Sequence, residues 1–404
     1  MRLKASSILA LEPDSCEAAT AAARAIMDGF GTEQPKLLLV YGTINHEQDQ
    51  ILQTLRASVG PGPLIVGCSA QGVVSNSRLT EEGYGLGVMG FGGSELEAAV
   101  AIERDVHDRP REKGRSIAAQ IKSRLGAEPE LVCVHYDASR GVNAQEMLAG
   151  MGSVLSCPIV GGGASLTWGL PVSTYQYLDT EALQGGLVAF GVSGPFDVEL
   201  GVCHGTTPTG VTMTVTRSDG NRILEIDGRP AAQVFSEATG HVPGEQLRQD
   251  FLVSWALAIE RTVSWPGPDG PRPRRTHMIR AAGAVDYETG AVRVQAGFPE
   301  GTRVALHQRT REAVLEGTKA MGEELVLRLA GRKPWAAMGF ECRGRTVPFL
   351  GAEGTLAEHD LLYSQIGCDV PWIGMMAWGE VASLGNEPAF HNYTYPVALL
   401  VPRA

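Results

Sequence analysis

The sequence predicts an α/β fold in which repeated α-β-α-β-β units form mixed sheets, with an antiparallel β-rich segment in the middle of the chain. The first observation behind this prediction is an apolar stretch that opens with proline and recurs at 35–41, 129–136 and 334–340. The second is that another apolar stretch follows each copy, after a segment whose apolar residues have helical spacing. Two strands joined through a helix are typically parallel and connected by a right-handed crossover.

Each unit is expected to hold the same elements in the same order. A helix comes first, followed by the proline-led strand, a second helix, a second strand that ends near a glycine, and a third strand. The first helices are expected at 15–30, 111–125 and 311–330, and the third strands at 84–91, 185–192 and 395–401. The glycines that end the second strands are Gly67, Gly161 and Gly374.

Glycine-rich turns follow the second strands at 67–72, 161–164 and 374–379. Ligand crevices in open α/β sheets usually lie at the carboxyl ends of strands. We therefore expect the three turns to meet around a shared pocket. The alternative is that these glycines only permit positive φ angles or close packing between strands.

The middle segment, 196–300, differs from the units on either side. Alternating apolar residues at 211–216, 222–228 and 292–296 predict antiparallel strands, and a helix is expected at 230–238. Four prolines in the stretch 264–275 predict an exposed loop. The chain thus divides into α/β regions at 1–195 and 301–404, with a β-rich connecting region at 196–300.

Composition and charge exclude several classes of protein. The 404 residues carry a net charge of −11, which disfavours binding to nucleic acid or to anionic membranes. No apolar run reaches the roughly 20 residues of a membrane span, so we expect a cytoplasmic protein. The seven cysteines include no C-x-x-C pair, which argues against structural zinc and a disulfide framework.

Several familiar enzyme motifs are excluded by the residues and predicted elements around them. The stretch 85–90 has the glycine pattern of a dinucleotide site, but it lies inside a strand with no helix after it. The stretch 67–72 is not a nucleophile elbow, and no two histidines have the spacing of a metal pair on a helix. We therefore assign no catalytic residue and no metal ligand.

Several motifs resemble the FIST family. The stretches 65–74, 210–216 and 220–231, which include the run L-E-I-D-G-R-P-A, are similar to its N domain, and C-R-G-R at 342–345, G-E-V at 379–381 and H-N-Y-T at 391–394 are similar to its C domain. The resemblance covers nearly the whole chain. It implies a sensory module, of a kind found in prokaryotes and eukaryotes, that binds a small ligand such as an amino acid and is often fused or adjacent to a histidine kinase or chemoreceptor. One subgroup binds haem and senses nitric oxide.

Eight residues are the candidate site residues. We expect Arg345 to bind a ligand carboxylate and Glu380 to bind an ammonium group, although a buried Glu–Arg pair that only fixes the fold is the alternative. His204 and His391 are the candidate haem ligands. The other candidates for ligand contact are Cys68, Ser69, Gly163 and Asn392.

The function we expect is that of a ligand-binding sensory protein that signals through a separate partner. Its cofactor is unknown, with haem as the first candidate and a gas sensor as the corresponding variant. An enzyme acting on a small metabolite through Cys68, Cys342 or Glu380 is the rival hypothesis from another class. A non-catalytic scaffold is the third.

Overall fold

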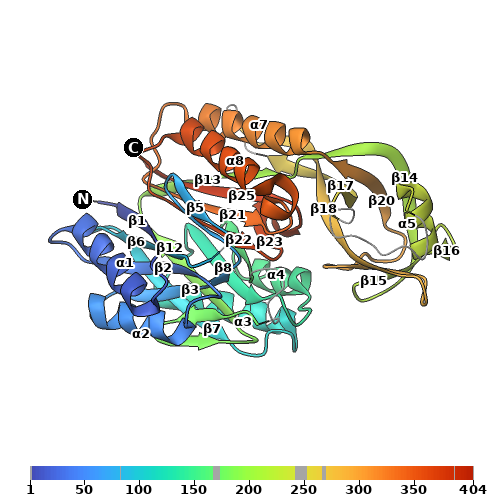
Figure 1. Ribbon diagram of the computed structural model, residues 1–404. Coiled ribbons are helices and arrows are strands. Elements are labelled where there is room, and N and C mark those ends of the chain that lie inside the picture. The colour runs from blue at the N-terminus through green and yellow to red at the C-terminus, as the bar shows by residue number, and fades with distance from the viewer. Residues whose placement is uncertain are drawn as a thin grey trace.

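The computed structural model describes residues 2–81, 83–166, 173–241, 253–265, 270–385 and 387–403. It confirms an α/β fold of three related units with mixed sheets, and an all-antiparallel sheet formed by the middle segment. In Figure 1 the three units lie together in one body, and the middle segment projects from one side of it.

The first unit contains all the repeated elements, and its first helix shows how a single side chain determines where an element begins. Its elements are β1 (Lys4–Ala10), α1 (Ser15–Phe30), β2 (Pro35–Thr43), α2 (Gln48–Val59), β3 (Leu64–Ala70) and β6 (Leu86–Gly92). Strands β2 and β3 are parallel, and β6 lies antiparallel between β1 and β2. Helix α1 begins where the Asp14 carboxylate accepts hydrogen bonds from the backbone N–H groups of Cys16 and Glu17. Such a side-chain cap is a usual helix start.

The second and third units repeat this order. The second contains β7 (Glu97–Glu103), α3 (Pro110–Leu125), β8 (Leu131–Asp137), α4 (Ala144–Gly152), β9 (Ile159–Ala164) and β12 (Leu187–Ser193). The third contains β13 (Phe196–Cys203), α7 (Arg311–Leu329), β21 (Ala336–Cys342), η1 (Thr346–Leu350), α8 (Gly351–Ile366), β22 (Trp372–Ala377) and β25 (Tyr395–Pro402). The repeat prediction is therefore confirmed, and each unit has one additional strand, β1, β7 or β13, before its first helix.

The units also exchange hairpins. The exchanged strands are β4 (Val73–Ser75) with β5 (Arg78–Thr80), β10 (Gln176–Leu178) with β11 (Glu181–Leu183), and β23 (Glu380–Leu384) with β24 (Glu387–His391). The hairpin of the first unit pairs with β22 of the third, that of the second with β3 of the first, and that of the third with β9 of the second. The three exchanges form a closed cycle that ties the units into one body.

A shared apolar core fills the centre of the three units. Strands β3, β9 and β22 contact one another there, so Gly67, Gly161 and Gly374 occupy equivalent places, as the repeat predicts. The expectation that their turns surround a common pocket is corrected, because side chains of all three sheets pack together in this space. They include Tyr41, Cys68, Val160, Phe190, Phe340 and Met375.

The middle segment forms a small barrel. Its strands are β14 (Thr206–Asp219), β20 (Arg303–Arg309), β17 (Trp255–Trp265), β18 (Arg272–Asp286), β19 (Ala291–Val294) and β15 (Arg222–Ile226), with the short β16 (Arg229–Pro230) beside β15. A further pairing between β14 and β15 closes the sheet on itself. The expected helix is present as α5 (Ala231–Thr239), which packs on β15 and β19. The barrel is inserted between the first strand and the first helix of the third unit.

The prediction of an irregular loop over 264–275 is wrong in part. Strand β17 runs to Trp265 and β18 begins at Arg272, so both ends of the stretch belong to the β17–β18 hairpin. Prolines at the end of a hairpin interrupt pairing less than prolines in a central strand, which explains why the strands extend this far. Residues 266–269 lie outside the described residues.

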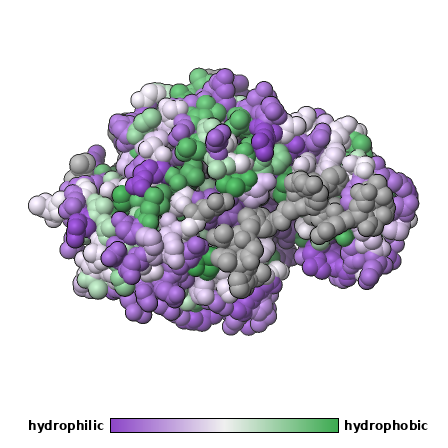
Figure 2. Space-filling model, in the orientation of Figure 1, coloured by the Kyte–Doolittle hydropathy of each residue, from purple (hydrophilic) through white to green (hydrophobic). Residues whose placement is uncertain are grey.

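The surface of the molecule is polar over much of the face shown in Figure 2. Hydrophobic residues gather on this face near α8 and β5. On α8, Leu356 is 41% exposed. Within the described ranges, no helix has the length and apolar character needed to cross a bilayer.

Candidate functional site

A cavity of about 620 Å³ lies where the second unit, the third unit and the barrel meet. The second unit contributes the loop after β8, including Ser139. The third contributes residues that follow β21 and β22, including Arg343 and Trp378, and the barrel contributes β18 and β19, including Gly283. The cavity therefore lies at the carboxyl ends of parallel strands, where α/β sheets usually bind ligands.

Aromatic side chains form much of the cavity wall. They are Tyr136, Trp378, Phe390 and Tyr393. The Tyr136 hydroxyl donates a hydrogen bond to the carbonyl of Gly379 at 3.2 Å. Gly379 has a φ of 86°, and a Cβ there would lie 2.6 Å from the Phe390 ring. Glycine is thus required at this position of the G-E-V motif, because a side chain would displace the wall.

The H-N-Y-T motif forms the turn between β24 and β25 and reaches the cavity. Asn392 lines the cavity, and its Oδ1 accepts a hydrogen bond of 3.1 Å from the backbone N–H of Ala281 in the barrel. Its Nδ2 donates to Oε1 of Gln295, also in the barrel. Tyr393 has a φ of 56°, a left-handed conformation that is uncommon for an aromatic residue. Such strain clusters at functional sites.

Arg343 brings a positive charge to the cavity. Its side chain is only 6% exposed, and the guanidinium carbon lies 4.7 Å from the centroid of the Trp378 ring. Burial lowers the pKa of Arg343 to about 10, so the group remains charged at neutral pH. A guanidinium stacked on an indole keeps its planar edge available for the bidentate hydrogen bonds that arginine makes to anions.

Glu380 lies behind the cavity wall, beside Tyr136 and Cys342. Its Oε2 accepts hydrogen bonds from the backbone N–H of Thr394 at 3.1 Å and from the Thr394 hydroxyl at 2.9 Å. The side chain is fully buried, and this burial raises the pKa of Glu380 to about 8. At neutral pH the carboxyl group is therefore mostly neutral.

This pKa predicts a pH-dependent stability. Between pH 4.5 and 8 the folded protein keeps a proton on Glu380 that the unfolded chain releases, so the free energy of unfolding falls as pH rises, by up to about 1.4 kcal/mol per unit. Urea titrations of the wild type and Glu380→Gln across this range measure the effect. The variant should lose this part of the slope, whereas parallel curves for the two proteins would contradict the assignment.

Comparison with known proteins places the chain in a family. Residues 36–229 match the FIST N domain and residues 231–383 match the FIST C domain. The chain belongs to the FIST family. An uncharacterized protein of Mycobacterium bovis is 24% identical over 396 residues, with 96% of each chain covered. An uncharacterized protein of Methanocaldococcus jannaschii is 27% identical over 210 residues, which is 50% of this chain and 40% of that protein.

Among solved structures, cyanuric acid hydrolase from A. caulinodans covers 100% of both chains at 10% identity, with a TM-score of 0.39. That score is too low to support any statement about this FIST protein. FIST domains are a proposed sensory family, and the curated relatives named above are uncharacterized.

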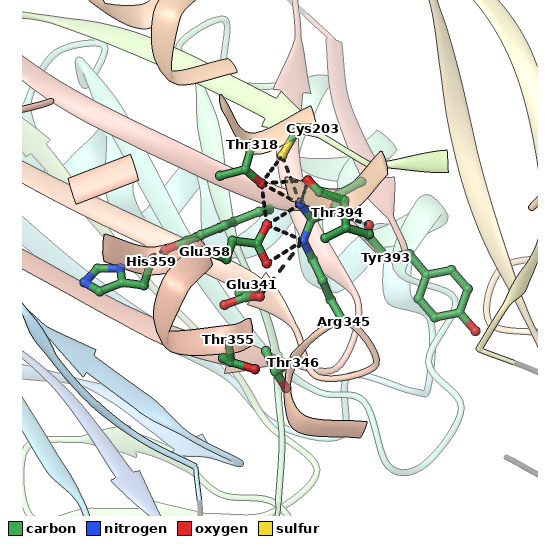
Figure 3. A network of polar contacts seen from close by, with 12 residues as sticks. Cys203, Thr318, Glu341, Arg345, Thr346, Thr355, Glu358, His359, Tyr393 and Thr394 are labelled. Carbon is green, nitrogen blue, oxygen red and sulfur yellow. Dashed lines mark hydrogen bonds and ion pairs between the residues drawn. The ribbon is translucent and has the colours of Figure 1, made fainter. Parts of the chain in front are cut away.

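Arg345 lies in a closed polar network beside the cavity of the FIST protein (Figure 3). It is fully buried, and its Nε lies 3.0 Å from Oε1 of Glu358. Its Nη2 donates to the Thr318 hydroxyl at 2.7 Å, and its Nη1 donates to the Tyr393 carbonyl at 3.2 Å. Arg345 is not part of the cavity lining, so it supports the H-N-Y-T turn from behind.

The three candidates from the glycine turns lie in the body of the FIST fold. The Cys68 thiol donates to the Met375 sulfur at 3.5 Å, and the Ser69 hydroxyl donates to the Ser165 carbonyl at 3.0 Å. The backbone of Gly163 pairs with residues 378 and 379, so it lies one layer behind the wall formed by Trp378. Burial raises the pKa of the Cys68 thiol well above its ordinary value, which keeps it protonated.

The two candidate haem ligands are also outside the cavity lining. His391 donates a hydrogen bond from Nε2 to the Ala382 carbonyl at 3.1 Å and is buried. His204 accepts a hydrogen bond of 3.1 Å at Nδ1 from the backbone N–H of Thr206. Its ring lies 6.4 Å from that of His307, and burial lowers the pKa of His204 to about 3.

Of the eight candidate residues, the structure places only Asn392 in the cavity lining. Sequence reasoning missed Arg343, although it stands two residues before Arg345 in the C-R-G-R motif, because the motif does not reveal which arginine faces inward. It also missed Tyr393 next to Asn392. Barrel residues such as Gly283 carried no motif at all.

Proposed function

We propose that this FIST protein is a sensory protein that binds a small ligand in the cavity between the barrel and the second and third units. The observation that supports it best is the cavity itself, whose volume of about 620 Å³ falls in the range of about 300–1,000 Å³ typical of small-molecule sites. Its wall combines aromatic rings with a few polar groups, as such sites usually do.

A ligand in this cavity would link parts that are far apart in the sequence. It would contact the turn at Asn392 and Tyr393, the segment after β21, and strands β18 and β19 of the barrel. Such ligand contacts would hold the barrel against the body that the three units form. Binding would then favour one arrangement of barrel and body over others, which is the requirement for a ligand to shift a conformational equilibrium.

The signal would pass to a separate partner, and a histidine kinase or a chemoreceptor is the partner that family membership suggests.

Haem does not fit this cavity. An axial ligand would have to come from the wall, and none of the lining residues that the structure describes is a histidine. Cys342, Tyr136 and Tyr393 line the cavity, but burial raises the pKa of each of these groups well above its ordinary value, which opposes the deprotonated form that ligation of iron requires. The same protonation argues against Cys342 as the nucleophile of an enzyme.

Filling the cavity tests the proposal. Gly283 lines the cavity, and an added Cβ would meet only the Arg293 carbonyl oxygen, at an ordinary distance of 3.6 Å. Gly283→Trp should therefore fold and weaken ligand binding at least about tenfold. Leu327→Trp, on α7 and 77% exposed at that position, is the matched control.

The measurement is a thermal-shift screen of small metabolites, followed by calorimetry on each compound that stabilises the wild type. Compounds should lose affinity for Gly283→Trp and keep it for Leu327→Trp. Equal affinity for all three proteins would place binding elsewhere, and a screen without any binder would refute the proposed function.

A further inference from the structure

The charge of the cavity wall is opposite to that of the whole protein. The chain carries a net charge of −11, yet the described lining residues include two arginines, Arg293 and Arg343, and neither aspartate nor glutamate. Arg343 is buried against Trp378, whereas Arg293 is exposed on β19. A pocket with charges of one sign and apolar walls concentrates ligands of the opposite sign.

Two further arginines form a second layer behind the aromatic wall. The Arg280 guanidinium lies 5.2 Å from the centroid of the Phe390 ring, and the Arg309 guanidinium lies 4.0 Å from that of Tyr393. Their exposed fractions are 1% and 2%. Each donates to backbone carbonyls, Arg280 to Phe390 at 2.7 Å and Arg309 to Gly344 at 3.1 Å. Among the described residues, neither has a carboxylate within ion-pair distance, although buried charges are normally paired.

The nearest buried carboxyl groups offset only part of this charge. Glu380 is mostly neutral at neutral pH, for the reason given above. Glu81 attracts Arg343 and also accepts hydrogen bonds from the Thr346 hydroxyl at 2.7 Å and the backbone N–H of Val347 at 2.9 Å. One negative charge thus stands against the three buried arginines Arg280, Arg309 and Arg343, so the surroundings of the cavity stay positive and favour an anion inside it.

The shape of the wall adds a second requirement. Tyr136, Trp378, Phe390 and Tyr393 offer ring faces and edges, on which flat rings pack with more stabilisation than their area alone provides. An amino acid fits less well, because the described lining residues hold no carboxylate for its ammonium group.

Resting on the proposed function, we infer that the ligand class is a flat aromatic or heteroaromatic ring bearing a carboxylate and no ammonium group. Arg343 binds the carboxylate and the aromatic residues hold the ring, while Asn392 lines the same cavity. This refines the expectation of an amino-acid ligand, which the family resemblance implied.

A panel of matched compounds tests the inference on the wild type alone. Each aromatic acid, such as benzoate, nicotinate or indole-3-acetate, is compared with its amide, with an amine on the same ring and with phenylalanine or tryptophan, by thermal shift and calorimetry at pH 7. Binders should be found among the acids, with amides at least about tenfold weaker. Binding of amides, amines or amino acids without the acids overturns the inference but leaves the proposed function intact. If no compound of the panel binds, the inference is overturned, and the proposed function is refuted as well only when the wider metabolite screen also finds no binder.

Substitutions of single arginines then identify the residue that contacts the carboxylate of the ligand. Arg343→Gln should lower the affinity for an acid by about 10- to 100-fold, with little change for the matched amide. Arg293→Gln, at an exposed position, should lower it by a few fold and tests the charge effect without disturbing the buried wall. Arg24→Gln on α1 removes the same charge far from the cavity and should change nothing. The role of Arg343 is overturned if Arg343→Gln and Arg24→Gln lose the same affinity for an acid. It is also overturned if Arg343→Gln loses the same affinity for the acid and for its amide.

Discussion

Glu358→Ala is expected to lower the free energy of unfolding by about 3–5 kcal/mol, because it leaves the Arg345 guanidinium buried without its main counter-charge. Arg345 and Glu358 are both fully buried, and Glu358 Oε1 accepts from Nε and Nη2 of Arg345. Glu341 is a poor substitute, because its Oε1 lies 4.0 Å from Arg345 Nε and burial raises the pKa of its carboxyl group. Urea unfolding at pH 7 measures the change.

Two controls make this result specific. Glu316→Ala removes an exposed carboxylate from α7 and should change the free energy of unfolding by less than about 0.5 kcal/mol. Arg345→Met combined with Glu358→Leu removes both charges and should recover most of the loss, since apolar residues of similar size often replace buried ion pairs at little cost. A Glu358→Ala protein within about 1 kcal/mol of the wild type would show that the pair does not hold the turn.

Gly161→Ala is expected to destabilise the protein by a similar amount, about 3–5 kcal/mol, and to reduce the yield of folded protein. Gly161 has a φ of 134°, and a Cβ there would lie 2.0 Å from the Val134 carbonyl oxygen of the neighbouring parallel strand. Backbone strain and overpacking each cost about 1–3 kcal/mol.

The third unit provides the matched control for this effect. Gly374 occupies the equivalent position, but its φ is not in the left-handed region and a Cβ would lie 3.1 Å from the Gly339 carbonyl oxygen. Gly374→Ala should therefore cost clearly less than Gly161→Ala. Equal losses in the two variants would show that strand spacing is not what requires glycine at this position.

The repeat was predictable because each unit repeats a strong local pattern. A proline-led apolar strand, a helix and a second strand can each be predicted from short-range sequence signals. These signals were sufficient to predict the parallel strand pairs. The hairpin exchange was not predictable, since β4, β10 and β23 pair with strands of other units and nothing within each hairpin identifies its partner. The additional strands β1, β7 and β13 pair with the last strand of their own unit, but they were left out of the predicted unit because it was taken to begin at its first helix.

The candidate site was predicted less well than the fold. Reasoning from the turns placed a pocket at the centre, where Cys68 and Met375 instead pack in a core. The cavity forms between the body and the barrel, and its charge comes from residues such as Arg280 and Arg343 that are distant in sequence. Only long-range packing brings them together, so motif positions alone could indicate Asn392 but not its surroundings.

A crystal structure of the wild type with the tightest-binding compound of the panel tests the central claim most directly. The account predicts density for the compound between the Trp378 and Tyr393 side chains, with its carboxylate at the Arg343 guanidinium and its ring facing β18 of the barrel. Density at the centre of the three units, or on the outer surface with this cavity filled only by solvent, would contradict it.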